Sequence, residues 1–225
     1  MKKVILAMSF IAIIASSCNK QATILPEANN VSQTEALQSD ADHYYHGKQV
    51  SLLQEISSYN TIGSAVIATD KINGKLEFYY FDTEIEELAF LTEQPVLKPL
   101  YDKLIQAIDL REYSIKSGAQ AEFASTGLVN ADFAAYASKH KARGGYDVLT
   151  SLAGFPGAAI YVPVGAPIAV FPPWIDNLGK SYNSPAGQGL VFRNFFFAGG
   201  SFGIFATPGA VNFPLVWRNI ISSAL

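Results

Sequence analysis

Apolar positions in the first half of the chain alternate or cluster in short runs, which predicts strands. Two tyrosines, Tyr44 and Tyr45, are followed by a His-Gly pair and a second apolar run at 50–53. The dipeptide Asn73-Gly74 separates the runs 63–69 and 76–81. Asn-Gly between two strand-like runs is the strongest short signal for a β-hairpin. We therefore expect a strand with a turn over 44–53, followed by two strands at 63–69 and 76–81 joined as a hairpin.

The apolar spacing changes from two to about three and a half after Phe81, which predicts a helix. Thr83 and Glu86 have the spacing of a capping box. The positions expected to face the core are Ile85, Leu88, Ala89 and Leu91. Glu84, Glu86 and Glu87 are expected on a solvated face, where they complement the positive helix N-terminus.

Two more helices are predicted before residue 145. The second begins near Pro99, because proline is tolerated in a first helical turn. Its apolar stripe consists of Leu100, Leu104, Ile105 and Ile108. The third begins at an Asn130 cap and ends near His140, and the glycine pair 144–145 would stop it. Residues 43–145 are therefore expected to be an α+β region, a small antiparallel sheet with helices.

Glycine, proline and aromatic residues dominate after residue 145, and they recur at a fixed spacing. The segment 192–201 contains Phe192, Phe197, Gly199 and Ser201 in an aromatic-x4-aromatic-x-Gly-x-Ser arrangement. A Phe-x-Gly at 155–157 precedes the one at 197–199 by 42 residues, and the segment 176–181 precedes 218–223 by the same interval. A constant offset at two separate anchor points indicates an internal repeat.

This repeated pattern resembles the Greek-key signature of βγ-crystallins. The resemblance covers 146–225 and implies an all-β sandwich of two Greek-key motifs, in which paired aromatics fill each hairpin corner. The glycine would adopt a conformation that a side chain forbids, and the serine hydroxyl would tie the hairpin down. The first copy departs from the pattern, with Thr150 in place of an aromatic and Ala159 in place of the serine. A generic glycine-rich and aromatic-rich β-sandwich is the alternative.

The resemblance also implies calcium sites, because this family binds calcium through side-chain and backbone oxygens of a short motif. The matching residues are Asp176, Asn177, Asn219 and Ser222. Lys180 and Arg218 replace two ligand positions. If the two copies share ligands, one weak site would remain. If each copy serves its own site, both would be impaired, and the residues would stabilise their loops instead.

The N-terminus has the pattern of an export signal. Lys2 and Lys3 precede an apolar run at 4–14, which is too short to span a membrane, and small residues follow before Cys18. This ending resembles the lipobox of bacterial lipoproteins, which implies a membrane anchor through lipid on Cys18 and a location in the cell envelope, on the outer membrane or facing the periplasm. An ordinary secretory signal is the alternative. Residues 1–18 would then be the signal and lipobox, and 19–42 a polar tether.

Composition narrows the function classes. The chain has 225 residues, of which 49% are apolar, and a formal net charge of -3. A nucleic-acid-binding protein needs a basic surface, so we expect no nucleic-acid partner. Cys18 is the single cysteine of the chain, which leaves it no partner for an internal disulfide.

Other candidate chemistry does not point to an enzyme. The segment 199–203 fits the nucleophile-elbow pattern G-x-S-x-G, but the acid and histidine that should follow the serine are missing, because all three histidines lie upstream. His43 and His46 would lie on opposite faces of a strand and are expected at the surface.

The stretch that begins at Val162 and ends at Pro173 combines apolar residues with four prolines and a glycine. It would either form an exposed partner-binding loop or pack against the α+β region. We expect a non-enzymatic, lipid-anchored protein with a structural or ligand-binding Greek-key region. The alternatives are an inhibitor of secreted proteases, with this stretch as its inhibitory loop, and an enzyme with a site in the α+β region.

Overall fold

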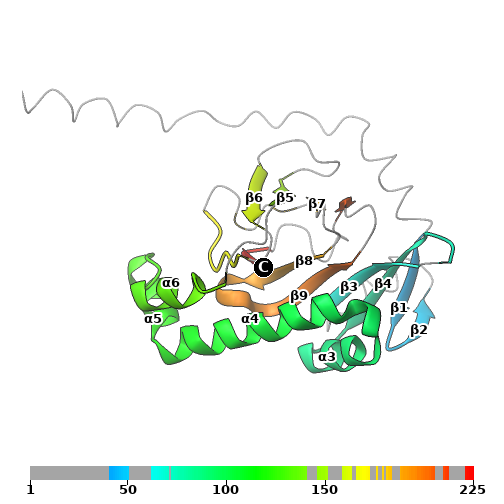
Figure 1. The fold of residues 1–225 in the computed structure, drawn as a ribbon, viewed down its shortest axis with the longest axis horizontal. Coiled ribbons are helices and arrows are strands. Elements are labelled where there is room, and N and C mark those ends of the chain that lie inside the picture. Colours follow the sequence, from blue (N-terminus) through cyan, green and yellow to red (C-terminus); the bar gives the residue numbers. More distant parts are fainter. Residues whose placement is uncertain are drawn as a thin grey trace, which may run out of the picture.

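A computed structural model gives the fold of the parts of the chain that carry most of the predicted elements. It describes residues 41–50, 62–70, 72–140, 146–151, 159–163, 166–172, 176, 179, 181–183, 188–205, 210–212 and 221–225. Within these residues the chain forms helices and two β-sheets (Figure 1). The larger sheet is mixed and the smaller one is antiparallel.

The larger sheet has seven strands from both halves of the chain. Their order is β11 (Ser223–Ala224), β8 (Gly189–Asn194), β9 (Ala198–Phe205), β3 (Ser64–Thr69), β4 (Leu76–Phe81), β1 (Asp42–Tyr45) and β2 (Lys48–Val50). Two of the pairings, β3 with β9 and β1 with β4, are parallel. The sheet that contains β1 to β4 is therefore mixed, where the sequence predicted a small antiparallel one.

The smaller sheet has four strands and lies on the opposite side of the larger sheet from the long helix (Figure 1). Its order is β10 (Ala210–Asn212), β7 (Ser181–Asn183), β5 (Tyr146–Thr150) and β6 (Ala159–Pro163). The helices are α3 (Glu84–Glu93), α4 (Lys98–Lys116), α5 (Ala119–Thr126) and α6 (Ala131–Ala137), with short 3-10 turns η1 (Pro95–Leu97) and η2 (Phe195–Phe197). The layers are helices, larger sheet and smaller sheet.

The β3–β4 hairpin at Asn73-Gly74 is confirmed, and it carries apolar residues on both faces. Ala65 and Ile67 of β3 join the core on the side of the smaller sheet. Val66 and Ala68 join the core under the helices. Alternate residues of a strand point to opposite faces, so a strand buried on both faces needs a continuous apolar run. This is why 64–69 lacks the polar alternation of a half-exposed strand.

The predicted helix starts are confirmed. The Thr83 side chain accepts a hydrogen bond from the Glu86 N–H, and the Glu86 carboxylate accepts one from the Asp82 N–H at 3.0 Å. The Asn130 side chain caps α6 by accepting from the N–H groups of Asp132 and Phe133. Such caps satisfy backbone donors that the first helical turn leaves without partners.

The predicted core face of α3 is right only in part, because Leu88 and Leu91 pack in the core under the helices but Ile85 does not. Ile85 is 79% exposed, while Glu87 is completely buried together with Leu91, one turn further along. The expected solvated acidic face is also wrong, because Glu84 forms a two-pronged ion pair with Arg111 of α4, at 2.7 and 3.0 Å. Glu87 instead faces the larger sheet, where the Ser201 hydroxyl donates a hydrogen bond to its carboxyl.

The boundary predicted after residue 145 does not separate two sheets. Strand β9 lies parallel to β3, with Ala65 opposite Phe202 and Ile67 opposite Ile204. Strands from 41–145 and from 146–225 therefore share one backbone hydrogen-bonded ladder. Each half contributes to the same two cores.

The 42-residue repeat has an exact counterpart in strand pairing. In β5–β6 the partners are Asp147 and Val162, Val148 and Tyr161, Leu149 and Ile160, and Thr150 and Ala159. In β8–β9 they are Gly189 and Ile204, Leu190 and Gly203, Val191 and Phe202, and Phe192 and Ser201. Each residue of the second set follows its equivalent by 42 positions. The two hairpins have the same register.

We call the two copies of the 42-residue repeat the first and the second unit. The third strand of each unit is shifted by the same 42 positions. Strand β7 pairs with β5 as β11 pairs with β8, so that Thr150 opposite Ser181 corresponds to Phe192 opposite Ser223. The outer pairings cross between the units. Ile168, from the first unit, bridges to Ala224 of β11, while β10 of the second unit pairs with β7 of the first. The two units thus exchange one segment each.

The corner between β8 and β9 has the predicted aromatic pair and glycine conformation, but a different serine from the predicted one. Phe192 and Phe197 are buried and contact each other edge to face, with 5.5 Å between ring centroids, and Gly199 has a φ of 79°. The hydroxyl that ties the corner belongs to Ser223, which accepts from the Phe197 N–H and donates to the Asn194 carbonyl. Ser201 instead donates to Glu87.

Candidate functional site

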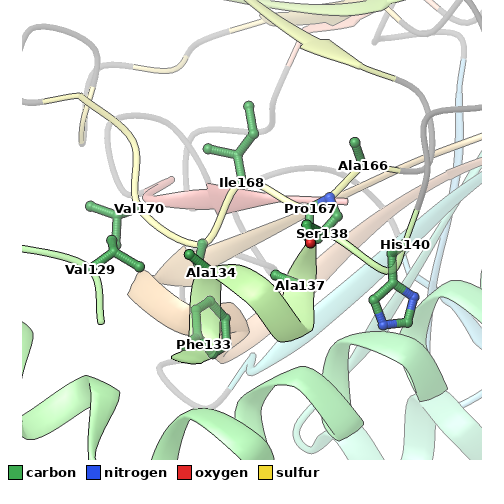
Figure 2. A pocket seen from close by; sticks show the side chains of 11 residues that line it. Val129, Phe133, Ala134, Ala137, Ser138, His140, Ala166, Pro167, Ile168 and Val170 are labelled. Atoms are coloured by element: carbon green, nitrogen blue, oxygen red, sulfur yellow. The ribbon is translucent and has the colours of Figure 1, made fainter. Parts of the chain in front are cut away.

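One candidate for a binding site is an apolar hollow between α6 and the segment 166–170, with a volume of about 390 Å³ (Figure 2). We call it the main hollow. Residues from α6 and the turn after it line one side, and 166–170 line the other (Figure 2). Val129 and Val170 lie at one end and His140 at the other (Figure 2). The lining residues are Val129, Phe133, Ala134, Ala137, Ser138, His140, Ala166, Pro167, Ile168, Ala169 and Val170.

The wall at 166–172 is held by backbone hydrogen bonds to two other segments, η2 and 221–225. Ile168 exchanges two hydrogen bonds with Ala224, at 2.9 and 3.0 Å. The Ala169 carbonyl accepts from the Phe196 N–H at 2.7 Å, and the Phe171 N–H donates to the Ser222 carbonyl at 2.9 Å. Ala169 and Phe171 are buried. The hydrogen bonds attach this part of the proline-rich stretch to η2 and the C-terminal segment, within the second half of the chain. Ala169 also belongs to the core cluster that contains Leu100 and Leu104 of α4, so the stretch contacts the α+β region as the second alternative expected.

A smaller hollow of about 280 Å³ adjoins the main one. Val129 and Val170 line both, so the two hollows share this pair as a common wall. The smaller one is otherwise lined by Phe123, Gly127, Phe171, Pro172, Asp176 and Phe195. Leu128, next to the shared pair, is 68% exposed. Small-molecule sites in proteins are mostly apolar with a few polar groups, and this region fits that description, with Ser138, His140 and Asp176 as its polar members.

The predicted calcium ligands are described in part. Asn177 and Asn219 lie outside the described residues, as does the predicted lipid attachment site Cys18. Asp176 donates its backbone N–H to the Pro172 carbonyl, and the Ser222 carbonyl accepts from Phe171. The two described candidates are thus attached to adjacent residues of the same segment. Calcium binding by them stays a prediction.

The histidines near the start of the described chain have different environments. His43, expected at the surface, is buried. It stacks on Phe78 at 4.8 Å between ring centroids, and its Nδ1 lies 3.1 Å from the Tyr80 hydroxyl. The expectation for His43 is wrong because β1 pairs with β4 and turns this residue into the core. His46 is exposed, and its Nε2 lies 3.3 Å from an Asp82 carboxylate oxygen.

Glu87 is a buried titratable group that the sequence did not reveal. Burial raises the pKa of its carboxyl to about 8, and the hydroxyls of Ser201 and Ser64 oppose this shift. Only the Ser201 hydroxyl has hydrogen-bond geometry to the carboxyl, and Glu87 Oε1 and Ser64 Oγ have no such partner among the described residues. The carboxyl is therefore mostly neutral at pH 7 and acts as a packed polar group.

Ser201, the serine of the G-x-S-x-G segment, lies inside strand β9 and is fully buried. A nucleophile elbow instead places its serine on a sharp turn between a strand and a helix. Its environment is thus that of a structural residue beneath α3. Among the described residues no helix has the length and apolar character needed to cross a membrane.

About a third of the chain is similar to a solved structure. No family model matches the chain, and no curated protein matches it. A solved structure of a βγ-crystallin from Ciona intestinalis is similar over 36% of this chain and 96% of that chain, with 21% sequence identity and a TM-score of 0.31. A TM-score of this size does not by itself establish a common fold.

Proposed function

We propose that this chain is a non-enzymatic, lipid-anchored binding protein of the bacterial cell envelope, and that it holds a compact apolar small molecule in the main hollow. The observation that carries the proposal is the hollow between α6 and 166–170. Its volume of about 390 Å³ falls within the range of about 300–1,000 Å³ typical of small-molecule sites. Its lining is apolar apart from Ser138 and His140.

The scaffold of this site is proposed to be a pair of Greek-key motifs within 146–225. Support comes from the matched registers of β5–β6 and β8–β9 and from the crossed outer pairings. Ile168, which forms one of the crossed pairings, also lines the main hollow. The segment of the first unit that pairs with β11 of the second unit therefore forms one wall of the main hollow.

The ligand class follows from the lining. Burying an apolar group in such a hollow supplies free energy of about 25 cal/mol per Å² removed from water. Ser138 and His140 would orient a single polar group at one end. A flat ring system or a short branched hydrocarbon with one polar substituent fits this arrangement.

The test is a titration of the full chain with the apolar ring dye 8-anilinonaphthalene-1-sulfonate, followed by fluorescence. We expect one saturable site. Ala137→Phe would place a ring in the hollow and weaken binding at least tenfold. Ala135→Phe, on an exposed position of α6 outside the lining, is the matched control and should bind like the unmodified chain. Unsaturable binding, or equal binding by Ala137→Phe, would contradict the proposal.

The membrane anchor is proposed on the resemblance of residues 15–18 to a lipobox. Incorporation of labelled palmitate in a bacterial host should be lost in Cys18→Ser, and labelling that persists would refute the anchor.

Protease inhibition is not supported by the described part of the proline-rich stretch. Buried residues such as Ala169 and Phe171 do not form an exposed loop that enters a protease cleft. A weak calcium site at Asp176 and Ser222 predicts a higher melting temperature in millimolar calcium, and an unchanged melting temperature would discard the site.

A further inference from the structure

Three metal-ligating side chains from separate segments meet at the edge of the larger sheet. His46 lies in the turn between β1 and β2, Asp82 follows β4, and Glu86 lies in the first turn of α3. One ligand atom from each lies within 4.8 Å of the other two. We propose that these three residues bind a divalent transition metal ion of the zinc type, with solvent at the remaining coordination position.

The parallel pairing of β1 with β4 brings the first two ligands together. Tyr45, the last residue of β1, lies opposite Tyr80, one residue before the end of β4. His46 and Asp82, which follow these strands, therefore lie at the same end of the sheet. The Tyr45 hydroxyl donates to Asp82 Oδ1 at 2.6 Å, which leaves Oδ2 directed at His46. The Asp82 carboxylate is thus oriented by a partner other than the proposed metal, as is usual for ligating carboxylates.

The backbone under the ligands is tightly held. His46 and Gly47 both have positive φ, of 48° and 71°, in a two-residue hairpin turn. A turn with positive φ at both residues has one favoured shape, and this shape sets the position of the imidazole. The Asp82 N–H donates to Glu86 Oε2 at 3.0 Å, so the third ligand is held next to the second.

The distance between the first two ligand atoms suits two ligands of one metal ion. His46 Nε2 and Asp82 Oδ2 are 3.3 Å apart, longer than the usual range of about 2.7–3.2 Å for N–H···O hydrogen bonds. Zinc bonds to nitrogen and oxygen of about 2.0–2.1 Å place neighbouring ligands of a tetrahedron about 3.3–3.4 Å apart.

The ligand types select the class of ion. An imidazole nitrogen with two carboxylate oxygens suits zinc and its first-row neighbours. Calcium and magnesium prefer oxygen ligands alone, and calcium needs six to eight of them. His46 has 47% of its side chain exposed, which gives an ion in solution access to the site.

The test uses the full chain and Zn²⁺ in isothermal titration calorimetry at pH 7. We expect one zinc per chain with a Kd in the micromolar range, and no displacement by millimolar Mg²⁺ or Ca²⁺. His46→Asn should weaken binding at least tenfold, and asparagine tolerates the positive φ of this turn, so the fold is kept. Glu86→Gln should weaken binding similarly while its amide oxygen still accepts the Asp82 N–H.

The matched control is Glu93→Gln, an exposed carboxylate at the other end of α3, which should bind zinc like the unmodified chain. Absence of zinc binding up to millimolar concentration would overturn the proposal. Equal zinc binding by His46→Asn would also overturn it, because the ion would then be held elsewhere. Circular dichroism of each variant verifies that a lost affinity does not come from a lost fold.

Discussion

At the scale of single residues, Glu87 has the most unusual environment in the described chain. A carboxyl that is fully buried must lose its charge or find strong partners, because water no longer solvates it. Here one serine hydroxyl is available, and burial raises the pKa of Glu87 to about 8. Glutamate is ordinarily charged at neutral pH, and at this position the fold favours its neutral form.

We predict that stability falls as the pH rises from about 4.5 to about 8. The unfolded chain releases the Glu87 proton near pH 4.5, while the folded chain keeps it until about pH 8, so the folded state binds more protons in this window. Glu87→Gln should remove this part of the pH dependence, which urea unfolding at pH 5 and pH 8.5 would measure. Glu93→Gln, exposed on the same helix, should keep it. An unchanged slope in Glu87→Gln would show that another group titrates.

At the scale of elements, the close approach of β9 to the start of β3 depends on glycine. Gly200 has a φ of 92°, and a Cβ at this position would lie 1.8 Å from the Gly63 carbonyl oxygen. A Cβ at Gly63 would in turn lie 2.3 Å from the Asp82 carbonyl oxygen. These contacts are between backbone atoms, so no side-chain rotation relieves them. Gly200 thus packs on Gly63, and Gly63 packs on the backbone of Asp82.

We predict that Gly200→Ala lowers the free energy of unfolding by about 3 kcal/mol or more, through both the clash and the positive φ. Gly74→Ala is the matched control, because its φ of 72° is similar but no atom lies within 4 Å of the added Cβ. Its cost should be about 1–2 kcal/mol, from conformation alone. Urea unfolding of the two variants measures both values. Equal losses would mean that the contact with Gly63 relaxes easily.

At the scale of the whole molecule, the two halves of the chain complete each other's cores. Leu190, Phe192 and Phe197 from the second half pack with Leu100 and Leu104 of α4. Strand β9 uses its outer edge to pair with β3. Without residues 41–145, the second half would expose both an apolar face and an unpaired strand edge, which is a template for aggregation.

We predict one cooperative thermal transition for the whole chain, with equal calorimetric and van't Hoff enthalpies. The fragment 146–225 should lack a fixed fold, measured as loss of near-ultraviolet circular dichroism. The reciprocal fragment 41–145 should lack it as well, because β3 would have no neighbour on one side. Two separate transitions, or a fragment that melts sharply by itself, would instead support independent domains with a boundary after residue 145.

Local chemistry made several features predictable from the sequence. The Asn73-Gly74 hairpin, the Thr83 and Asn130 caps and the aromatic corner at 192–199 each depend on residues only a few positions apart. The 42-residue interval was also readable, and it reappears as an identical register in the two hairpins. The sequence alone determined these elements, because turn, cap and repeat signals act through neighbours along the chain.

The tertiary structure decided which elements meet. The pairing of β9 with β3, the burial of Glu87, the meeting of His46 with Asp82 and the main hollow all join segments far apart in the chain. Helical periodicity placed Ile85 in the core and Glu87 in solvent, and the packing of α3 on the sheet reversed both. Periodicity specifies an apolar stripe but not the surface it will cover. Long-range contacts are selected by the free energy of the complete packing, which no local pattern contains.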